Sequence, residues 1–167
     1  MIETNRLVIQ PLTYNQLYKH LYSPEELGAE LHIIPSIIEM DEAARESTII
    51  DFLPYIQDPE KDYRFYTLWI VIEKCSRRLV GNICFHGEAD VDDEIEIGYG
   101  IEKDFRNQGI MTETIGGLIH WLKFNKLAKI LKVETECENI SSIKVLKKNN
   151  FKICQKKEKT VIMKLTL

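Results

Sequence analysis

The middle of the chain alternates between hydrophobic and polar residues, which is the pattern of strands that expose one face. Segment 66–73 is rich in aromatic and β-branched residues, and segments 79–86 and 94–101 alternate with period two. The face predicted to point inward in the second segment carries Leu79, Gly81, Ile83 and Phe85. In the third segment Ile95, Ile97 and Tyr99 share one face, and Glu94, Glu96 and Gly98 share the other. With a polar turn at 75–78, these segments predict an antiparallel meander.

The hydrophobic spacing then changes to that of a helix. Four apolar residues follow one another at four, three and four positions: Met111, Ile115, Leu118 and Leu122. This spacing predicts an amphipathic helix over about 108–124. Segment 130–137 again has the pattern of a strand. A strand–helix–strand crossover of this kind should place 94–101 and 130–137 parallel to each other in one sheet.

The two ends of the chain add helices and strands around this centre. Thr13 and Gln16 have the spacing of a capping box. Ser23 before Pro24, with Glu26 three positions after the serine, is a second helix start. The remaining elements are expected as a strand at 6–12, helices at 13–22, from 24 onward and at 38–53, a helix at 141–149, and strands at 151–155 and 161–165. This order predicts the α/β class, with a mixed sheet of the α+β kind, in one domain over residues 1–167.

Composition narrows the classes of function. The chain has 167 residues, 44% hydrophobic and 29% charged, and a net charge of −4. It therefore resembles an ordinary soluble domain and lacks the basic character of most nucleic-acid-binding proteins. The first residues are not the apolar run of a signal peptide, and no apolar stretch is long enough to span a membrane. The four cysteines form no Cys-x-x-Cys pair and the histidines do not cluster, so we expect no metal site, reduced thiols and a cytoplasmic location.

Segment 95–113 has the order strand, short turn, helix start. The free N–H groups and the dipole of a first helical turn bind phosphate. Gly109 allows the backbone to approach a ligand closely, and Arg106 adds a fixed positive charge. On this segment alone, an ordinary helix cap with an exposed arginine is the favoured explanation. The segment is not a dinucleotide fingerprint, because Lys103 stands where that motif needs its third glycine, and the chain has no Gly-Lys-Ser/Thr triplet of a P-loop.

Three motifs occur in a fixed order along the chain. They are Glu96-Ile-Gly98-Tyr99, then Arg106-Asn-Gln-Gly109-Ile-Met111-Thr-Glu113, then Glu138-Asn139-Ile-Ser-Ser142 followed by Leu146 and Asn150-Phe151. In order and spacing they resemble the GNAT superfamily of N-acetyltransferases, and within it the branch that includes ribosomal-protein N-terminal acetyltransferases and spermidine acetyltransferases. The opening Glu3-Thr-x-Arg6-Leu-x-Ile9 is also similar to the start of that branch. The resemblance covers nearly the whole chain and is strongest from residue 94 to residue 151.

The resemblance implies a mostly antiparallel sheet of six to seven strands, splayed at its central parallel pair, with helices on both faces. It implies acetyl-coenzyme A as the co-substrate, bound in the opening between the splayed strands without a metal. The pyrophosphate would lie on the loop of Arg106, Asn107, Gln108, Gly109, Ile110, Met111 and Thr112. The pantetheine arm would lie along Tyr99, Gly100 and Ile101, with Asn139 and Ser142 nearby.

Some residues depart from the family's pattern or have a plainer explanation. Met111 stands where glycine or alanine is common, which the loop tolerates if the side chain points into the core. Asn150 replaces a glycine, and asparagine is the next best residue for the left-handed conformation that ends a helix. Tyr99 is also explained as a core aromatic and Asn139 as a turn residue. Lysines 147 and 148 are expected on a solvated face, and contact of one of them with the 3′-phosphate of the coenzyme is the less favoured alternative.

The acceptor side rests mainly on Glu96. In this branch the matching acid lies near the acceptor amine, so Glu96 is the candidate base, and a solvated sheet carboxylate is the alternative. His86 is a candidate substrate contact, and Ser142 is the candidate donor to the leaving thiolate. The expected reaction is direct attack of an amine on acetyl-coenzyme A in a ternary complex, by a monomer or homodimer. A non-catalytic acyl-coenzyme A binding or sensing module is the alternative, and the amine could belong to a peptide N-terminus, a polyamine, an aminoglycoside or an amino acid.

Overall fold

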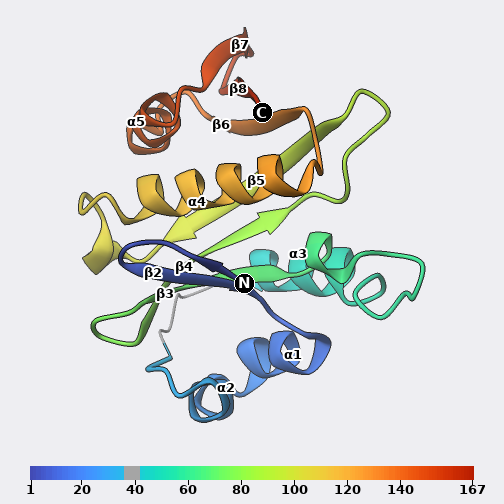
Figure 1. Cartoon of the computed structure of the whole chain (residues 1–167), viewed down its shortest axis with the longest axis vertical. Coiled ribbons are helices and arrows are strands. Elements are labelled where there is room, and N and C mark those ends of the chain that lie inside the picture. Colours follow the sequence, from blue (N-terminus) through green and yellow to red (C-terminus); the bar gives the residue numbers. More distant parts are fainter. Residues whose placement is uncertain (36–41) are drawn as a thin grey trace.

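The computed structural model describes residues 1–35 and 42–167, and one sheet of eight strands forms its centre (Figure 1). The strands are β1 (Ile2–Glu3), β2 (Leu7–Pro11), β3 (Leu68–Glu73), β4 (Arg78–Phe85), β5 (Glu94–Ile101), β6 (Ile130–Glu136), β7 (Lys152–Lys156) and β8 (Thr160–Thr166). They lie in the order β1-β2-β3-β4-β5-β6-β8-β7, and all neighbours are antiparallel except β5 and β6. The predicted meander and parallel pair are confirmed. The count exceeds six to seven because β1, too short to show a periodic pattern, pairs with β2.

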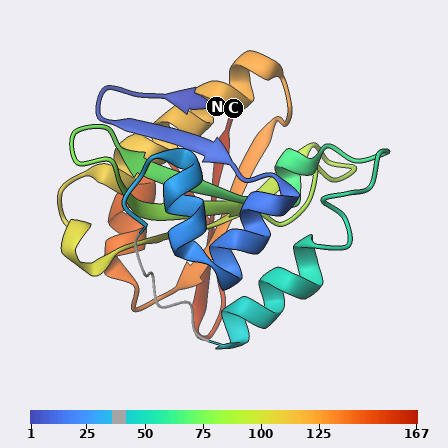
Figure 2. The same cartoon turned by 90° about the horizontal axis from the view of Figure 1, so that it is seen from below.

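Helices cover both faces of the sheet, as predicted (Figures 1 and 2). They are α1 (Tyr14–Tyr22), α2 (Pro24–Leu31), α3 (Glu42–Phe52), α4 (Ile110–Asn125) and α5 (Ile140–Lys148). The first three pack on one face, in a buried cluster that includes Leu17, Leu27 and Phe52. The last two pack on the other face, where Leu118 of α4 and Leu146 of α5 are buried. In the described part of the chain, no helix is long and apolar enough to cross a membrane.

The parallel pair β5–β6 holds together over only part of its length. Its pairing ends at Glu96 and Lys132, although β5 continues to Ile101 and β6 to Glu136. Beyond that point β5 keeps its pairing with β4, and β6 keeps its pairing with β8. The two strands therefore separate like the arms of a V, and each arm has one edge whose backbone groups the other arm no longer pairs.

The inward face predicted for β4 is wrong at Leu79. Leu79 is buried against the α1–α3 side, whereas Ile83 and Phe85 are buried on the α4 side. The reason is a β-bulge: Leu79 and Gly81 have partners in β3, but the intervening Val80 has none. An extra residue reverses the alternation on its far side, and nothing in the hydrophobic pattern of β4 marks where that residue is.

The predicted helix ends agree with the structure in part. Thr13 accepts a hydrogen bond from the Gln16 N–H, and the Gln16 side chain caps Thr13 in return, so the capping box is confirmed. The Ser23 side chain makes no capping hydrogen bond. Ser23 is also the C-cap of α1, where its N–H donates to the carbonyl of Lys19. The start of the helix predicted at 38–53 falls on residues 36–41, outside the described residues.

The two residues that depart from the family's pattern, Met111 and Asn150, are both accommodated by the fold. Met111 is 4% exposed and lies in the core under α4. Asn150 has a φ of 65°, in the left-handed region. Helix α4 begins at Ile110 and not at residue 108, because Gly109 has a φ of 77°, which no helical residue adopts.

Candidate active site

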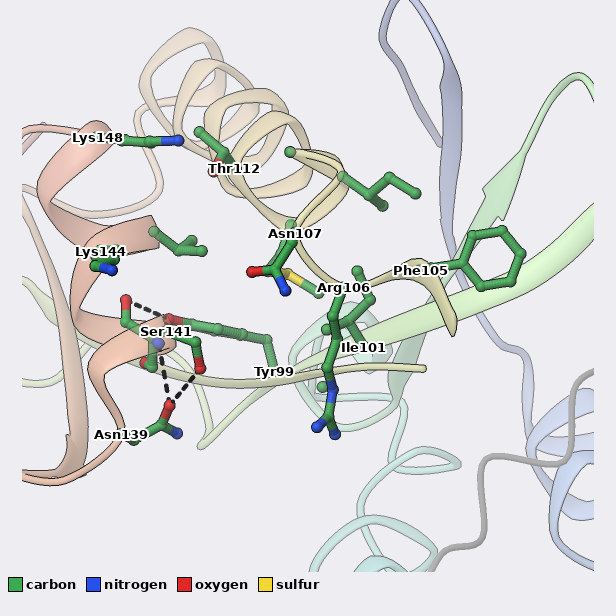
Figure 3. Close-up of a pocket in the computed structure, with 16 residues that line it drawn as sticks. Tyr99, Ile101, Phe105, Arg106, Asn107, Thr112, Asn139, Ser141, Lys144 and Lys148 are labelled. Atoms are coloured by element: carbon green, nitrogen blue, oxygen red, sulfur yellow. Dashed lines mark hydrogen bonds between the residues drawn. The ribbon is translucent and has the colours of Figure 1, made fainter. Parts of the chain in front are cut away.

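A cavity of about 570 Å³ lies between the open part of β5, the loop before α4 and the start of α5 (Figure 3). Its walls are Tyr99, Gly100, Ile101, Phe105, Arg106, Asn107, Gly109, Ile110, Met111, Thr112, Asn139, Ser141, Ser142, Lys144, Val145 and Lys148. All residues predicted to contact the coenzyme are among them except Gln108. The Gln108 side chain donates to the carbonyl of Asp104 at 2.8 Å, so it stabilises the turn that precedes α4.

The loop before α4 has the conformation of an anion site. Asn107 and Gly109 both have left-handed backbones, with φ of 60° and 77°, and the helix begins at the next residue, Ile110. Helix geometry leaves the first N–H groups of α4 without partners inside the helix, at the positive end of its dipole. Backbone concavities of this kind bind phosphate groups. A Cβ at Gly109 would lie 3.6 Å from Arg6 Nη2, an ordinary contact, so glycine is needed here for its conformation and not for room within the protein.

The segment between β1 and β2 contacts this loop and the start of α4. We use the name N-terminal clamp for Thr4 and Arg6 of that segment together with Glu113 of α4. Glu113, in the first turn of α4, accepts from Thr4 Oγ1 at 2.6 Å and from the Arg6 N–H at 2.8 Å. Arg6 Nε lies 2.6 Å from the second Glu113 oxygen, and Arg6 Nη1 donates to the carbonyl of Gln108 at 3.1 Å. Burial raises the pKa of Glu113, but the hydrogen bonds from Thr4 and Arg6 outweigh it and hold the pKa below its ordinary value. Sequence reasoning saw these residues only as parts of motifs and assigned them no role.

Helix α5 supplies the opposite wall of the cavity. Asn139 is its N-cap: the Oδ1 atom accepts from the Ser142 N–H at 3.0 Å and from Ser141 Oγ at 2.8 Å (Figure 3). Four residues of α5 that were not predicted also line the cavity: Ser141, Lys144, Val145 and Lys148. Their spacing of three, one and three positions is that of a single helix face, which is the sequence signal that would have found them.

Two hydroxyl groups meet where β5 faces α5. Tyr99 Oη and Ser142 Oγ lie 2.7 Å apart, and Ser142 is 8% exposed. Burial raises the pKa of Tyr99, and the hydrogen bond to Ser142 offsets this only in part. Tyr99 is therefore protonated at neutral pH, and the pair can donate a proton or a hydrogen bond to a group in the cavity.

The residues predicted for the acceptor, Glu96 and His86, are not among the cavity walls. Glu96 alternates with core residues of β5, so it lies on the sheet face away from α4. A Cβ at Gly98, which shares that face, would lie 3.2 Å from Cys84 Sγ and 3.3 Å from His86 Nε2. His86 therefore lies beside β5 on the face of Glu96. Burial raises the pKa of the Cys84 thiol, which keeps it protonated and weakly nucleophilic.

The Glu96 carboxylate has a partner that sequence reasoning missed. Lys132 Nζ lies 2.7 Å from Glu96 Oε2, and these two residues form the last pair before β5 and β6 separate. The ion pair therefore stands at the point of the V. No periodic signal in β6 distinguishes Lys132 from a solvated lysine, because only the strand register brings it beside Glu96.

The residues lining the cavity suit an anionic ligand that also has apolar parts. Arg106 comes from the loop before α4, and Lys144 and Lys148 come from α5 (Figure 3). Apolar side chains such as Ile101 and Val145 line the same space. Within residues 1–35 and 42–167, no group of three or more His, Cys, Asp or Glu side chains is placed to hold a metal ion, and the four cysteines are free.

Comparison with known proteins identifies similar chains. The family model described as Acetyltransferase (GNAT) domain matches residues 6–152. The protein named uncharacterized N-acetyltransferase YjdG, from Bacillus subtilis (strain 168), is 25% identical over 154 residues, which are 90% of this chain and 89% of that protein. The structure of ribosomal-protein-S5-alanine acetyltransferase from Vibrio fischeri superimposes with a TM-score of 0.68 at 13% identity, over 98% of this chain and 94% of the other. RimL, a ribosomal L7/L12 α-N-protein acetyltransferase solved in complex with coenzyme A, gives a TM-score of 0.68 at 13% identity, over 98% and 96%.

Proposed function

The chain belongs to the GNAT acetyltransferase family, and from this premise we propose that it transfers the acetyl group of acetyl-coenzyme A to a primary amine by direct attack in a ternary complex. The observation that carries the proposal is the V between β5 and β6, which opens beside the glycine-containing start of α4. One side of this opening suits the coenzyme, and the other side holds a carboxylate at the point where the strands meet.

We assign the coenzyme to the cavity. The N–H groups of Gly109 to Thr112 would hold the pyrophosphate, and Arg106, Lys144 and Lys148 would supply positive charge to its phosphates. The pantetheine arm would run along the free edge of β5 toward the point of the V, because that edge offers unpaired N–H and C=O groups to its amides. Coenzyme A in the RimL structure supports this assignment at the level of the shared fold.

Glu96 is the proposed base. An alkylamine has a pKa of about 10 and is mostly protonated at pH 7, so a group near the thioester must accept a proton before the nitrogen can attack. The Glu96 carboxylate stands at the point of the V, on the face away from α4, and also attracts a cationic acceptor. Cys84, on the same face, has a raised pKa, so it offers no ready thiolate for a covalent route.

Ser142 and Tyr99 are proposed to assist the leaving group. The thiolate released from acetyl-coenzyme A must be stabilised or protonated as the carbon–sulfur bond breaks. Ser142 Oγ can donate to it while accepting from Tyr99 Oη, 2.7 Å away. Because the raised pKa of Tyr99 keeps its phenol protonated, the pair stays available as a hydrogen-bond donor to the leaving thiolate, which takes its proton from the attacking nitrogen.

The test is thiol release from acetyl-coenzyme A on a panel of amines: peptides with N-terminal alanine or serine, spermidine, an aminoglycoside and free amino acids. We expect Glu96→Gln to lower turnover by about 10- to 1,000-fold and to leave coenzyme affinity near the wild-type value. Glu94→Gln is the matched control, since Glu94 lies one pleat away on the same face and pairs with Lys164. A protein that binds acetyl-coenzyme A but releases no thiol with any amine is instead a non-catalytic acyl-coenzyme A binding module.

A further inference from the structure

A primary ammonium group already lies at the proposed base. The Lys132 ammonium contacts Glu96 at 2.7 Å, and the two side chains are 29% and 30% exposed. The hydrogen bond to Glu96 raises the pKa of Lys132, with smaller contributions from Glu94 and Asp90 that add to it. The acceptor amine of the proposed reaction needs the same surroundings: a cation held by carboxylates at the point where the strands separate.

A second lysine on the same face provides a comparison. Lys164 of β8 lies directly across from Lys132 in the strand register and forms an ion pair with Glu94. Its side chain is 31% exposed, so the two lysines match in exposure and in the type of partner. They differ in position: Lys132 is on β6 at the point of the V, and Lys164 is one strand further from the opening.

We propose that Lys132 is a built-in acceptor: its ε-amine occupies the acceptor's place at Glu96 and is acetylated by bound acetyl-coenzyme A when no other amine competes. The inference rests on the proposed function. Glu96 takes one proton from the Lys132 ammonium, and the nitrogen lone pair then attacks the thioester carbonyl carbon. The carbon–sulfur bond breaks as the amide forms, the second nitrogen proton goes to the leaving sulfur, and Glu96 returns its proton to water. The products are N-acetyl-Lys132 and coenzyme A.

The modification would change the acceptor site. Lys132 would no longer carry a charge, because an amide nitrogen is not basic. Glu96 would lose the cation that now pairs with it. The negative charges of Asp90 and Glu94, which now act on the Lys132 ammonium, would also lose that cation. Self-acetylation therefore leaves Glu96 without its paired cation, and an external cationic amine would no longer have to compete with the Lys132 ammonium for this carboxylate.

The experiment incubates the full chain with acetyl-coenzyme A alone and follows each lysine by peptide mass spectrometry. We expect Lys132 to be acetylated at least about tenfold faster than Lys164, a difference of about 1.4 kcal/mol in barrier. Glu96→Gln should slow labelling of Lys132 by a factor similar to its effect on amine turnover, and should leave Lys164 unchanged. Equal rates at the two lysines, or a Lys132 rate that Glu96→Gln does not change, would show spontaneous acylation and overturn the inference.

The outcome is separable from that of the proposed function. Acetylation of panel amines without preferential labelling of Lys132 refutes the built-in acceptor alone. Preferential, Glu96-dependent labelling with no acetylation of any panel amine upholds the built-in acceptor and refutes transfer to the amines of the panel. If coenzyme A binds by calorimetry but neither Lys132 nor any amine is acetylated, both proposals are wrong.

Discussion

Substitution of Gly109 gives the most direct test of the proposed coenzyme site. Two substitutions separate its two roles. Gly109→Val places a β-branched residue at a φ of 77°, and a left-handed backbone costs an L-residue about 1–2 kcal/mol. For a chain of this length that corresponds to a fall in melting temperature of roughly 2–8 °C. Gly109→Asn adds a Cβ as well, but asparagine tolerates the left-handed region, and the nearest protein atom would be an ordinary 3.6 Å away.

Both variants should bind coenzyme A more weakly than wild type, because a Cβ at residue 109 stands where the pyrophosphate must approach the backbone. Loss of one hydrogen bond to a charged group is worth about 1.5–3 kcal/mol, or about 10- to 100-fold in Kd. Titration calorimetry with coenzyme A gives the affinity, and scanning calorimetry gives the melting temperature. Gly109→Asn should show the loss of affinity with nearly wild-type stability, and Gly109→Val should show both losses. Folded variants that both retain the wild-type Kd would mean that the pyrophosphate binds elsewhere.

The same structure makes two further predictions. Asn139→Ala should lower stability by about 1 kcal/mol, because it removes the cap of α5, and should weaken coenzyme A binding more than Ser141→Ala; equal, small effects on melting and affinity would leave Asn139 with neither role. The depressed pKa of Glu113 stabilises the fold at pH values above the ordinary carboxyl value of 4.5, and this contribution disappears as the pH falls through the lower folded value. Wild type should therefore be more stable than Glu113→Gln near pH 7, and the difference should shrink below about pH 5; melting curves that differ by the same amount from pH 3 to pH 7 would contradict the assigned ion pair.

Much of the fold follows from local pattern. The α4 stripe, the alternation of β5 and the crossover between β5 and β6 are each encoded by residues close together in the sequence, and each is confirmed. The bulge at Val80 is different, because it depends on how β4 pairs with β3. The two-residue β1 is likewise defined by its partner β2 and has no periodic pattern of its own.

Some residues of the candidate site can likewise be proposed from local sequence, and others depend on contacts that only the fold creates. The loop around Gly109 can be proposed from the sequence because its residues are consecutive, and most of them line the cavity. Lys132 and the N-terminal clamp could not be proposed from the sequence, because their contacts reach across strands or across most of the chain. Lys144 and Lys148 form an intermediate case, since their helical spacing was visible but the element they would face was not.

The N-terminal clamp also bears on the order in which the protein folds. Arg6 and Glu113 are 107 positions apart in the chain, and contacts of such long range form late, because closing a large loop costs entropy before the contact compensates for it. During synthesis the first strand region must wait for α4 to be made before Arg6 can reach Glu113. The meander of β3, β4 and β5 needs no such wait. We therefore expect the loop before α4 to become rigid among the last parts of the molecule, so that the coenzyme binding proposed for this loop would report completion of the whole fold and not of any one half.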